Sequence, residues 1–238
     1  MVIPLFNCQN TIDLTLKSIH FQNIKEIEII LINDFSLDNT SHIIEKFKSF
    51  DQRIKIINNL RNMGTFYSRC IGALKAHGEY IIGLDNDDLF LCEDIFETLY
   101  LNSKINNLDI SEIKSFNIPN YNPKFEEIKI GYYLSHQDNI ILHQPELRSF
   151  SLTINKNKVF TKDHFAWGKL IKASIYKKAI NKLGKERYSK YNCFTEDVTI
   201  VFVLFNIADS FAFLNIFGIF HIVTKTTTTF QLTTKQIL

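Results

Sequence analysis

Hydrophobic residues in the first part of the chain gather in short runs, and the segments between them show helical spacing. The runs cover residues 1–5, 27–32, 53–57 and 79–84. The run 27–32 is nearly continuous in apolar residues, which is typical of a strand buried on both faces of a parallel sheet. Helices are predicted over about 11–20, 40–50 and 65–76. Strands that alternate with helices in this way predict βαβ units and an α/β fold.

The remainder of the chain has a less regular pattern. Residues 102–160 mix polar and apolar positions, and we interpret them as an insertion or a smaller sub-domain. A helix is predicted over 166–183. Residues 200–223 are almost entirely apolar and long enough to cross a bilayer. Because a charge at Asp209, near the centre of that stretch, is costly in lipid, the pattern favours a buried helix, a turn and a core strand, with a membrane-associated segment as the alternative.

Composition and charge narrow the class of protein. With 238 residues, 45% of them hydrophobic and 22% charged, the chain has the make-up of a globular protein that can bury a sizeable core. A formal net charge of +2 gives no indication of the clustered Lys and Arg residues that bind nucleic acid. The four cysteines form no Cys-x-x-Cys pair, which argues against a zinc site or a disulfide framework and favours a reducing, cytoplasmic compartment. The first predicted strand begins very close to Met1, so a trimmed amino terminus is one of the alternatives that the sequence leaves open.

Three carboxylates lie close together at the end of the fourth apolar run. Asp85, Asp87 and Asp88 come directly after residues 80–84. Crowded acids are costly unless a cation shares them, and Mg²⁺ and Mn²⁺ prefer oxygen ligands, often one or two carboxylates plus phosphate oxygens. Open α/β folds bind ligands at the carboxyl ends of their strands, so the acids predict a metal–diphosphate site there. The alternative is an acidic turn that caps the next helix through Asp87 or Asp88.

Four segments, in order along the chain, resemble glycosyltransferase family 2 enzymes with a GT-A fold. They are VIPLFN (2–7), INDFSLDNT (32–40), NMGTFYSRCIGALKAHGEYI (62–81) and LDNDD (84–88). The chain departs from the family pattern at three positions, with Phe35 in place of glycine, Ser68 in place of alanine and Cys70 in place of asparagine. The resemblance implies one domain with a Rossmann-like, mostly parallel central sheet flanked by helices. Residues 1–100 would form its nucleotide-sugar-binding half, and residues 101–238 its smaller acceptor-binding and catalytic-base half.

The carboxyl-terminal half carries two looser similarities. HFAWGKLIKASIY (164–176) resembles the Trp-x-Lys-Leu helix of many non-processive members, and FTEDV (194–198) resembles the Glu-Asp pair that holds the catalytic base. The Gln-x-x-Arg-Trp motif of processive members does not occur. The resemblance therefore implies transfer of a single sugar, with inversion, from a nucleoside-diphosphate sugar to a hydroxyl group. UDP-sugar is the expected donor, Mn²⁺ or Mg²⁺ the expected cofactor, and a glycan, lipid or protein the expected acceptor.

Six residues in the first half are expected to bind the nucleotide, Asp85 among them. By the resemblance, Pro4, Phe6 and Asn7 close one wall of the base pocket, and Phe6 can pack against the ring. Asp34 ends the second strand, where its carboxylate can accept a hydrogen bond from a uracil N–H, and Arg69 is placed near the nucleotide. The alternatives are a core role for Phe6, a turn role for Asp34 and a solvated helix charge for Arg69.

The metal ligands are expected among the clustered acids and one late histidine. Asp85 and Asp87 lie two residues apart, so in an extended strand both side chains would point to one face. By family analogy, Asp87 is the direct metal ligand and Asp85 approaches the ribose or the metal. The cation would offset the charge that builds on the diphosphate as a Lewis acid. His221 is included as an extra ligand, with a hydrogen-bonded core histidine as the alternative.

The general base is expected in the segment 194–198. Inverting transfer needs a carboxylate that takes the proton of the acceptor hydroxyl during in-line attack, and the resemblance assigns this role to Asp197, with Glu196 as an acceptor-binding or supporting group. Burial next to apolar residues can raise the pKa of such a base toward this task. The same acids also fit the first turn of a helix, where they would cap it. Trp167 can form a platform for a sugar ring or belong to the core.

Two other functions stay open. A nucleotidyltransferase shares the α/β layout and an acidic metal site, but it usually has an early Gly-rich phosphate loop with Arg and Lys, and residues 4–11 contain none of these. The missing Gly-x-Gly-x-x-Gly turn argues equally against a dinucleotide-binding Rossmann domain. A binding-only, inactive relative is the other alternative, which Phe35 supports. A location at the cytoplasmic face of a membrane, by peripheral association, is left open beside a cytoplasmic one.

Overall fold

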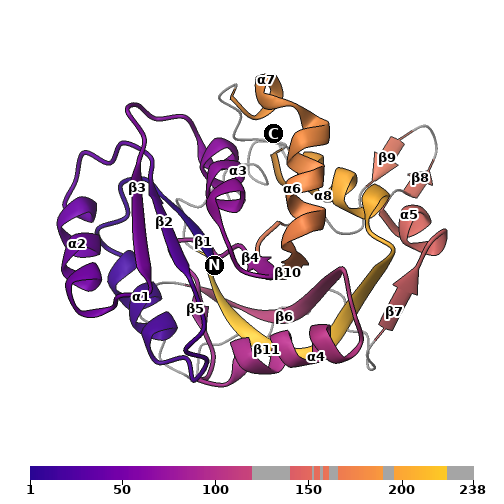
Figure 1. The fold of residues 1–238 in the computed structure, drawn as a ribbon, viewed down its shortest axis with the longest axis horizontal. Helices are drawn as coiled ribbons and strands as arrows, with labels where there is room; N and C mark the ends of the chain where they lie inside the picture. The colour runs from indigo at the N-terminus through magenta and orange to yellow at the C-terminus, as the bar shows by residue number, and fades with distance from the viewer. Residues whose placement is uncertain (120–139, 152, 156–157, 161–165, 190–195, 224–238) are drawn as a thin grey trace.

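The computed structural model describes residues 1–119, 140–151, 153–155, 158–160, 166–189 and 196–223 (Figure 1). Its first part contains β1 (Val2–Leu5), α1 (Ile12–His20), β2 (Ile29–Asn33), α2 (Thr40–Phe50), β3 (Ile54–Asn58), α3 (Thr65–Lys75) and β4 (Tyr80–Ile82). Its second part contains β5 (Leu89–Phe90), α4 (Ile95–Ile105), β6 (Ile110–Pro119), β7 (Ile140–His143), α5 (Glu146–Ser151), β8 (Thr153–Asn155), β9 (Lys158–Phe160), β10 (Lys169–Lys172), α6 (Ala173–Leu183), α7 (Lys185–Tyr188), α8 (Glu196–Ile207) and β11 (Ser210–Val223).

The first four strands run parallel, as predicted. β1, β2 and β3 form a sheet in that order, with Val2 opposite Ile30 and Ile29 opposite Ile54. β4 lies on the other side of β1, where a parallel bridge joins Val2 to Gly83. The α/β class and the alternation of strands and helices are therefore confirmed, and the carboxyl ends of β1, β2 and β4 share one edge.

The second part extends this arrangement with a mixed sheet that the apolar pattern did not predict. Its order is β4-β10-β6-β11-β5, with β7 also on β11; β6 and β11 are parallel, and the other pairs are antiparallel. β6 lies inside the segment 102–160, for which the sequence predicts an insertion or sub-domain but no particular strand. The helix predicted over 166–183 was wrong in its first third, because residues 169–172 pair with β4 and β6 as β10 and the helix begins only at Ala173.

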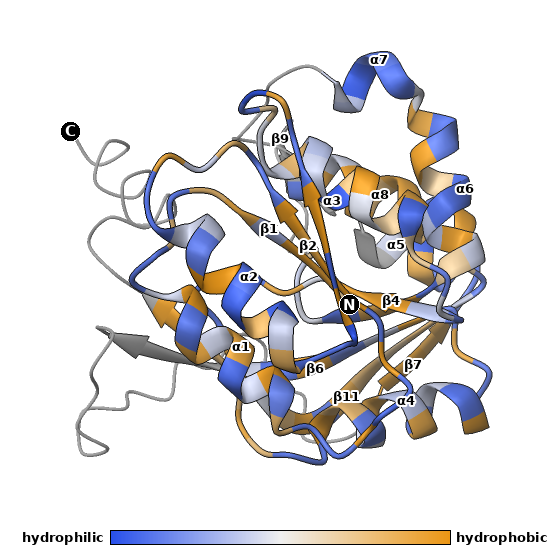
Figure 2. Cartoon of the chain, turned by 60° about the vertical axis from the view of Figure 1, so that its left-hand side comes forward, coloured by the Kyte–Doolittle hydropathy of each residue, from blue (hydrophilic) through white to orange (hydrophobic). Residues whose placement is uncertain are grey.

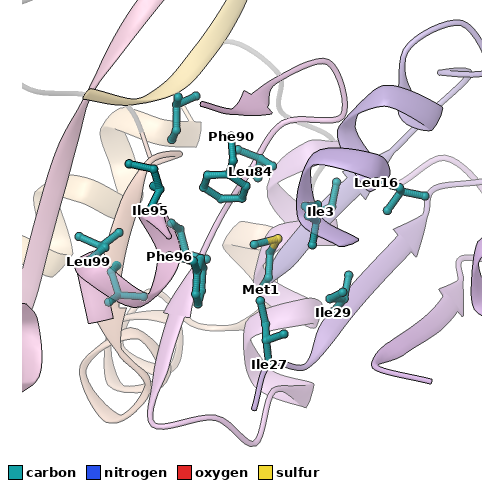
Figure 3. Close-up of a cluster of buried hydrophobic side chains, with 14 of the residues drawn as sticks. Met1, Ile3, Leu16, Ile27, Ile29, Leu84, Phe90, Ile95, Phe96 and Leu99 are labelled. Carbon is teal, nitrogen blue, oxygen red and sulfur yellow. The ribbon is translucent and has the colours of Figure 1, made fainter. Parts of the chain in front are cut away.

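Alternate residues of β1 and β2 face opposite helical layers, which explains why these two strands are almost entirely apolar. Ile3 and Ile29 pack toward α1 and α2, in a cluster that also holds residues of α4 (Figure 3). Val2 and Ile30 face the other way, toward α3, α6 and α8. Figure 1 shows α1 and α2 outside one face of β1–β3 and α3 on the other, and Figure 2 shows hydrophilic and hydrophobic residues alternating along α1 and α2.

The apolar stretch 200–223 is divided between two elements, as predicted. α8 ends at Ile207 and β11 begins at Ser210, and the backbone N–H of Asp209 between them donates to Asp109 Oδ2 at 2.8 Å. Among the described residues, none of the helices combines the length and the apolar character needed to cross a bilayer.

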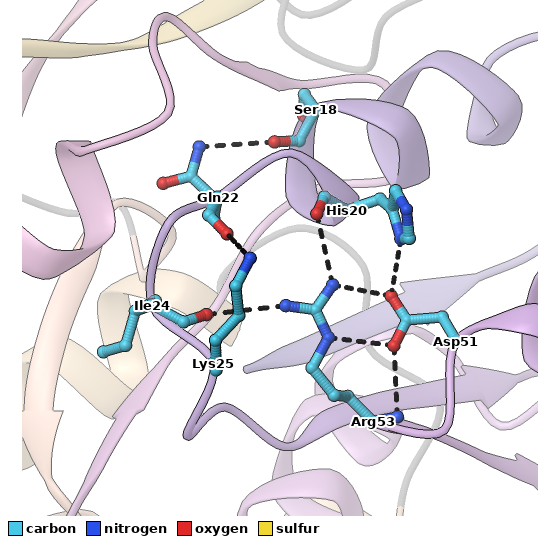
Figure 4. Close-up of polar contacts among 7 residues, drawn as sticks. All are labelled: Ser18, His20, Gln22, Ile24, Lys25, Asp51 and Arg53. Atoms are coloured by element: carbon cyan, nitrogen blue, oxygen red, sulfur yellow. Dashed lines mark hydrogen bonds and ion pairs between the residues drawn. The ribbon is translucent and has the colours of Figure 1, made fainter.

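A buried ion pair joins α1, α2 and β3 at the edge of the sheet away from the clustered acids (Figure 4). Asp51, 5% exposed, follows α2, and its carboxylate accepts hydrogen bonds from Arg53 Nε at 2.8 Å and Nη2 at 2.6 Å. His20 Nδ1 lies 2.9 Å from the same carboxylate. The Arg53 guanidinium also donates to the backbone carbonyl of His20 at 3.3 Å, so one carboxylate holds three elements together.

We expect Asp51→Asn to lower the free energy of unfolding by about 2 kcal/mol near neutral pH, because a buried charged hydrogen bond is lost. Hydrogen bonds from Arg53 hold the pKa of Asp51 well below its ordinary value of 3.8. This contribution is therefore complete above pH 3.8 and is lost as the pH falls through the lower, folded-state pKa. Urea denaturation at neutral and strongly acidic pH should show the difference between variant and wild type shrinking in acid.

The matched control is Asp13→Asn, which removes an exposed pair with Lys17 four residues along α1. Exposed pairs of this kind contribute little, so this variant should unfold like the wild type. A difference for Asp51→Asn that stays constant from neutral to acidic pH would contradict the assigned role of the carboxylate.

Candidate active site

The turns that follow β1 and β2 are joined by hydrogen bonds. The backbone N–H of Asn7 donates to Ser36 Oγ at 3.1 Å, and Asn7 Oδ1 accepts from the N–H of Leu37 at 2.9 Å. Phe6 is 45% exposed at the end of β1, so the structure places it outside the core. The carbonyl of buried Pro4 accepts a hydrogen bond from Asn86 Nδ2 at 3.1 Å. The predicted base-binding residues thus lie beside the acidic turn after β4.

Asp34 fixes the loop that leads into α3. Its carboxylate is buried, with Oδ1 accepting from Asn59 Nδ2 at 2.7 Å and from the N–H of Met63 at 2.8 Å. Oδ2 accepts from the N–H of Gly64 at 2.7 Å. Gly64 has a φ of 88°, a conformation that favours glycine, and directly precedes α3. Asp34 is therefore a turn-organising residue in this structure, and its hydrogen bond to a uracil N–H stays a prediction.

The clustered acids lie on a turn rather than on an extended strand. β4 ends at Ile82, a turn follows at Asn86 and Asp87, and the N–H of Asp88 donates to the carbonyl of Asp85 at 3.3 Å. The expectation that Asp85 and Asp87 share a face by strand alternation was therefore wrong. The chain has to turn here because β5 starts at residue 89 and pairs with β11 instead of continuing beside β1.

Asp88 pairs with His221, so its predicted alternative role as a helix cap was wrong. The next helix, α4, begins at Ile95 and is preceded by Asp94. Asp88 is fully buried, and its Oδ1 lies 2.8 Å from His221 Nδ1 on β11. The His221 ring also stacks on Trp167, with centroids 4.9 Å apart and planes 15° from parallel. Trp167 and His221 therefore form one wall beside the acids.

The electrostatics of the acidic turn fit a divalent cation. Burial, followed by the charges of Asp85 and Asp88, raises the pKa of Asp87 to about 7. The Oδ2 atom of Asp88 is buried with no hydrogen-bond donor among the described residues. A cation near Asp87 would relieve this crowding. In the described part of the chain, no three His, Cys, Asp or Glu side chains converge as a ready-made metal cage.

Arg69 connects the acidic turn to the predicted base. It lies on α3 with its side chain 6% exposed, and its guanidinium donates to Asp85 Oδ1 through Nη2 and to Asp197 Oδ1 through Nη1. Burial lowers the pKa of Arg69, but the charges of Asp197 and Asp85 more than offset this and raise it above its ordinary value. Arg69 is therefore a permanent cation between two carboxylates from distant parts of the chain.

Asp197 lies in the first turn of α8 and faces the site. Its side chain is 24% exposed. Burial raises the pKa of Asp197, with a further increase from Asp85, while the positive charges of Arg69 and Lys169 oppose the shift. A carboxylate that is buried, cation-paired and still partly accessible can accept a proton from a bound hydroxyl. The side chain of Glu196, its predicted supporting partner, lies outside the described residues.

Lys169 is a site residue that the sequence analysis did not single out. Its side chain is fully buried in β10, and its Nζ lies 3.1 Å from Glu112 Oε2 on β6. Its charge reaches Asp197 and stabilises the carboxylate form. The lysine of the Trp-x-Lys-Leu motif was visible, but the helix predicted there gave no reason to place it beside the base.

An open α/β sheet with clustered carboxylates at the carboxyl ends of its strands is the layout of α/β proteins that bind phosphorylated ligands at that edge. Direct comparison then gives the family. The family model of glycosyl transferase family 2 matches residues 1–166, which is more than half of the chain. The chain therefore belongs to glycosyl transferase family 2.

Two relatives illustrate the similarity. The glycosyltransferase GlyA of Streptococcus pneumoniae is 31% identical over 198 residues, which cover 79% of this chain and 27% of GlyA. The cholesterol galactosyltransferase of Borreliella burgdorferi is 39% identical over 110 residues, which cover 46% of this chain and 30% of that protein. The matched segments thus span 27% and 30% of the length of these relatives.

A solved structure shows the same fold. TarS of Staphylococcus aureus, residues 1–349 in complex with UDP, aligns with a TM-score of 0.71 over 94% of this chain and 60% of that chain, at 17% identity. A second structure of the same TarS segment contains UDP-GlcNAc. The likeness confirms the GT-A fold that the motifs implied.

Proposed function

We propose that this chain transfers a single sugar from a nucleoside-diphosphate sugar, with UDP as the expected nucleotide, to a hydroxyl group with inversion at the anomeric carbon. The observation that carries the proposal is the buried Arg69, which pairs with Asp85 of the acidic turn and with Asp197 of α8. Donor-side and acceptor-side carboxylates are thereby held within the reach of one guanidinium. In this proposal residues 1–100 bind the donor, and residues 101–238 supply the base and the acceptor side.

Asp197 is the general base of the proposed reaction. As the acceptor oxygen attacks the anomeric carbon, its proton passes to the Asp197 carboxylate. A bond forms between the acceptor oxygen and the sugar, the bond to the diphosphate oxygen breaks, and the electron pair leaves with the nucleoside diphosphate. Because attack and departure lie on opposite faces of the sugar, one displacement inverts the anomeric carbon. The charge of Arg69 favours the ionised form of the carboxylate and opposes the rise in the pKa of Asp197 that burial causes.

Asp87, with Asp85, would hold a divalent cation, Mn²⁺ or Mg²⁺. When bound, this ion supplies Lewis-acid stabilisation of the leaving diphosphate. A cation would stabilise the ionised form of Asp87, whose pKa is raised to about 7 by burial and by two neighbouring carboxylates. His221 is a third candidate ligand, because its Nδ1 lies 2.8 Å from Asp88 Oδ1, which leaves Nε2 for a cation. The hydrogen bond to Asp88 and the charges of the acids outweigh burial and raise the pKa of His221 to about 9, so a cation bound there would have to displace a proton.

The comparisons support the expected donor and suggest a class of acceptor. TarS structures contain UDP and UDP-GlcNAc, and the galactosyltransferase of Borreliella burgdorferi is named for a lipid, cholesterol. We propose a UDP-sugar donor and a lipid-linked acceptor that the protein meets at a membrane surface. The free thiols of Cys8, Cys70 and Cys92 fit the reducing environment of the cytoplasm.

The test is a hydrolysis and transfer screen of UDP-sugars and other nucleotide-sugars in the presence of Mn²⁺, combined with titration of UDP with and without the metal. Metal-dependent UDP binding with sugar release supports the proposal. Preference for a nucleoside triphosphate would instead favour the nucleotidyltransferase alternative, and tight binding without any turnover would favour a binding-only relative.

Asp87→Ala is expected to abolish the effect of Mn²⁺ on UDP binding, because the variant lacks the carboxylate most in need of a cation. Isothermal titration with UDP should then give the same weak affinity with and without the metal. The control is Glu93→Ala, which removes an exposed acid close by in the chain and should leave the metal effect intact. A metal effect of wild-type size in Asp87→Ala would move the ligand role to another residue.

A further inference from the structure

Phe35 has a backbone conformation that a bulky residue rarely adopts. Its φ is 63°, in the left-handed region that favours glycine. Three hydrogen bonds of the turn account for this conformation. The N–H of Ser36 donates to Asn33 Oδ1 at 3.1 Å, and Asn7 is bonded to both Ser36 and Leu37. The turn therefore holds residue 35 in the left-handed region whatever its side chain.

The scaffold under this turn is fixed as well. Asn33 is buried, and its Nδ2 donates to Ser41 Oγ and to Asn58 Oδ1, each at 3.0 Å. The carboxylate of Asp34 is fastened to the loop before α3. The direction in which residue 35 leaves the backbone is thus set by buried contacts on both sides of it.

Burial does not compensate for the strained backbone. The Phe35 side chain is 46% exposed, whereas Phe47 and Phe66, on the helices of the same half, are 5% and 3% exposed. A residue that is unfavourable for the backbone and only half-buried contributes little to folding. Strained residues of this kind gather at ligand sites.

The position of Phe35 indicates the ligand. The N–H of Asp34 donates to the carbonyl of Leu5 at 2.8 Å, so Phe35 and Phe6 follow neighbouring strand ends. Both rings are nearly half exposed, and both belong to turns at the edge that carries the acidic turn. Exposed aromatic rings at such an edge bind the flat faces of nucleobases by stacking.

We propose that Phe35 packs against the nucleobase of the donor and is a nucleobase-binding residue of this chain. The inference rests on the proposed function, because it needs a nucleotide at this edge. It assigns to Phe35 a contact with the base alone, so that the diphosphate and the metal are bound independently of it.

The experiment compares wild type with Phe35→Gly in binding and in stability. Glycine accepts the left-handed conformation without strain, so the variant should melt at the same temperature as the wild type or higher. Loss of one stacking contact should weaken UDP binding about tenfold, while binding of pyrophosphate with Mn²⁺ stays unchanged. Phe35→Tyr keeps the ring and should retain wild-type affinity for UDP.

Leu37→Gly is the matched control, since it removes a more exposed apolar side chain, 79% exposed, from the same turn. It should bind UDP like the wild type. Wild-type UDP affinity in Phe35→Gly, or a lower melting temperature with equal losses for UDP and pyrophosphate, would overturn the inference and leave the proposed function standing. Failure of the wild type to bind any nucleoside diphosphate would instead remove the proposed function, and the inference with it.

Discussion

Asp197→Asn is expected to lower the rate of sugar transfer by about 10²–10⁴-fold, the usual contribution of a general base, while UDP binds with nearly unchanged affinity. The amide has the shape of the carboxylate but cannot take the proton of the acceptor. In the proposed function the nucleotide binds to turns of the first half, whereas Asp197 comes from α8, so kcat should fall without a matching rise in the Kd for UDP. Steady-state transfer assays and UDP titration on the same preparation measure both quantities.

The control for this variant is Asp209→Asn, which makes the same change at an exposed position just beyond α8. It should transfer sugar at the wild-type rate. Unchanged turnover in Asp197→Asn would falsify its role as the base, and a parallel loss of UDP binding would show that it supports the donor site instead.

The strands β1 and β2 could be predicted because both are buried on both faces. Residues such as Val2 and Ile3 must both be apolar when α3 lies on one side and α1 on the other, so the sequence shows an uninterrupted run. β10 could not be predicted in the same way. It begins and ends with a lysine, and only its pairing with β4 and β6 makes it a strand.

The sequence could predict which residues form the site better than it could predict how they are arranged. The motifs named Asp85, Asp87 and Asp197, but local alternation could not reveal the turn at Asn86 and Asp87, which depends on where β5 pairs. The pair between Asp88 and His221 joins residues 133 positions apart, and only the tertiary fold brings them together.

Arg69 had a local signal that would have indicated a buried ion pair. Phe66, Arg69 and Ala73 lie three and seven residues apart, which places them on one face of α3, and all three are buried. An arginine on an apolar helix face needs anionic partners to be stable there. The sequence could thus predict that Arg69 meets carboxylates, but not that these would be Asp85 and Asp197.

Arg69 pairs with Asp85 of the acidic turn and with Asp197 of α8. Arg69→Met should therefore lower both the stability of the protein and the rate of transfer. Without the guanidinium, Asp85 and Asp197 are left as neighbouring, only partly exposed carboxylates with no shared cation, so we expect the free energy of unfolding to fall by about 3 kcal/mol. We also expect transfer to fall at least as far as in Asp197→Asn, because the base loses both its position and the cation that keeps it ionised.

Arg69→Lys separates these two effects. Lysine restores the charge, but a single ammonium cannot reproduce the two-pronged geometry of the guanidinium, so stability should recover more than kcat does. Arg61→Met, at an exposed position in the loop before α3, is the matched control and should change neither quantity. If Arg69→Met kept wild-type transfer, or if Arg69→Lys recovered kcat as fully as stability, the arginine would be a structural ion-pair partner only. Loss of kcat that persists in a stable, correctly charged Arg69→Lys is the result expected of a residue that positions the base against the donor.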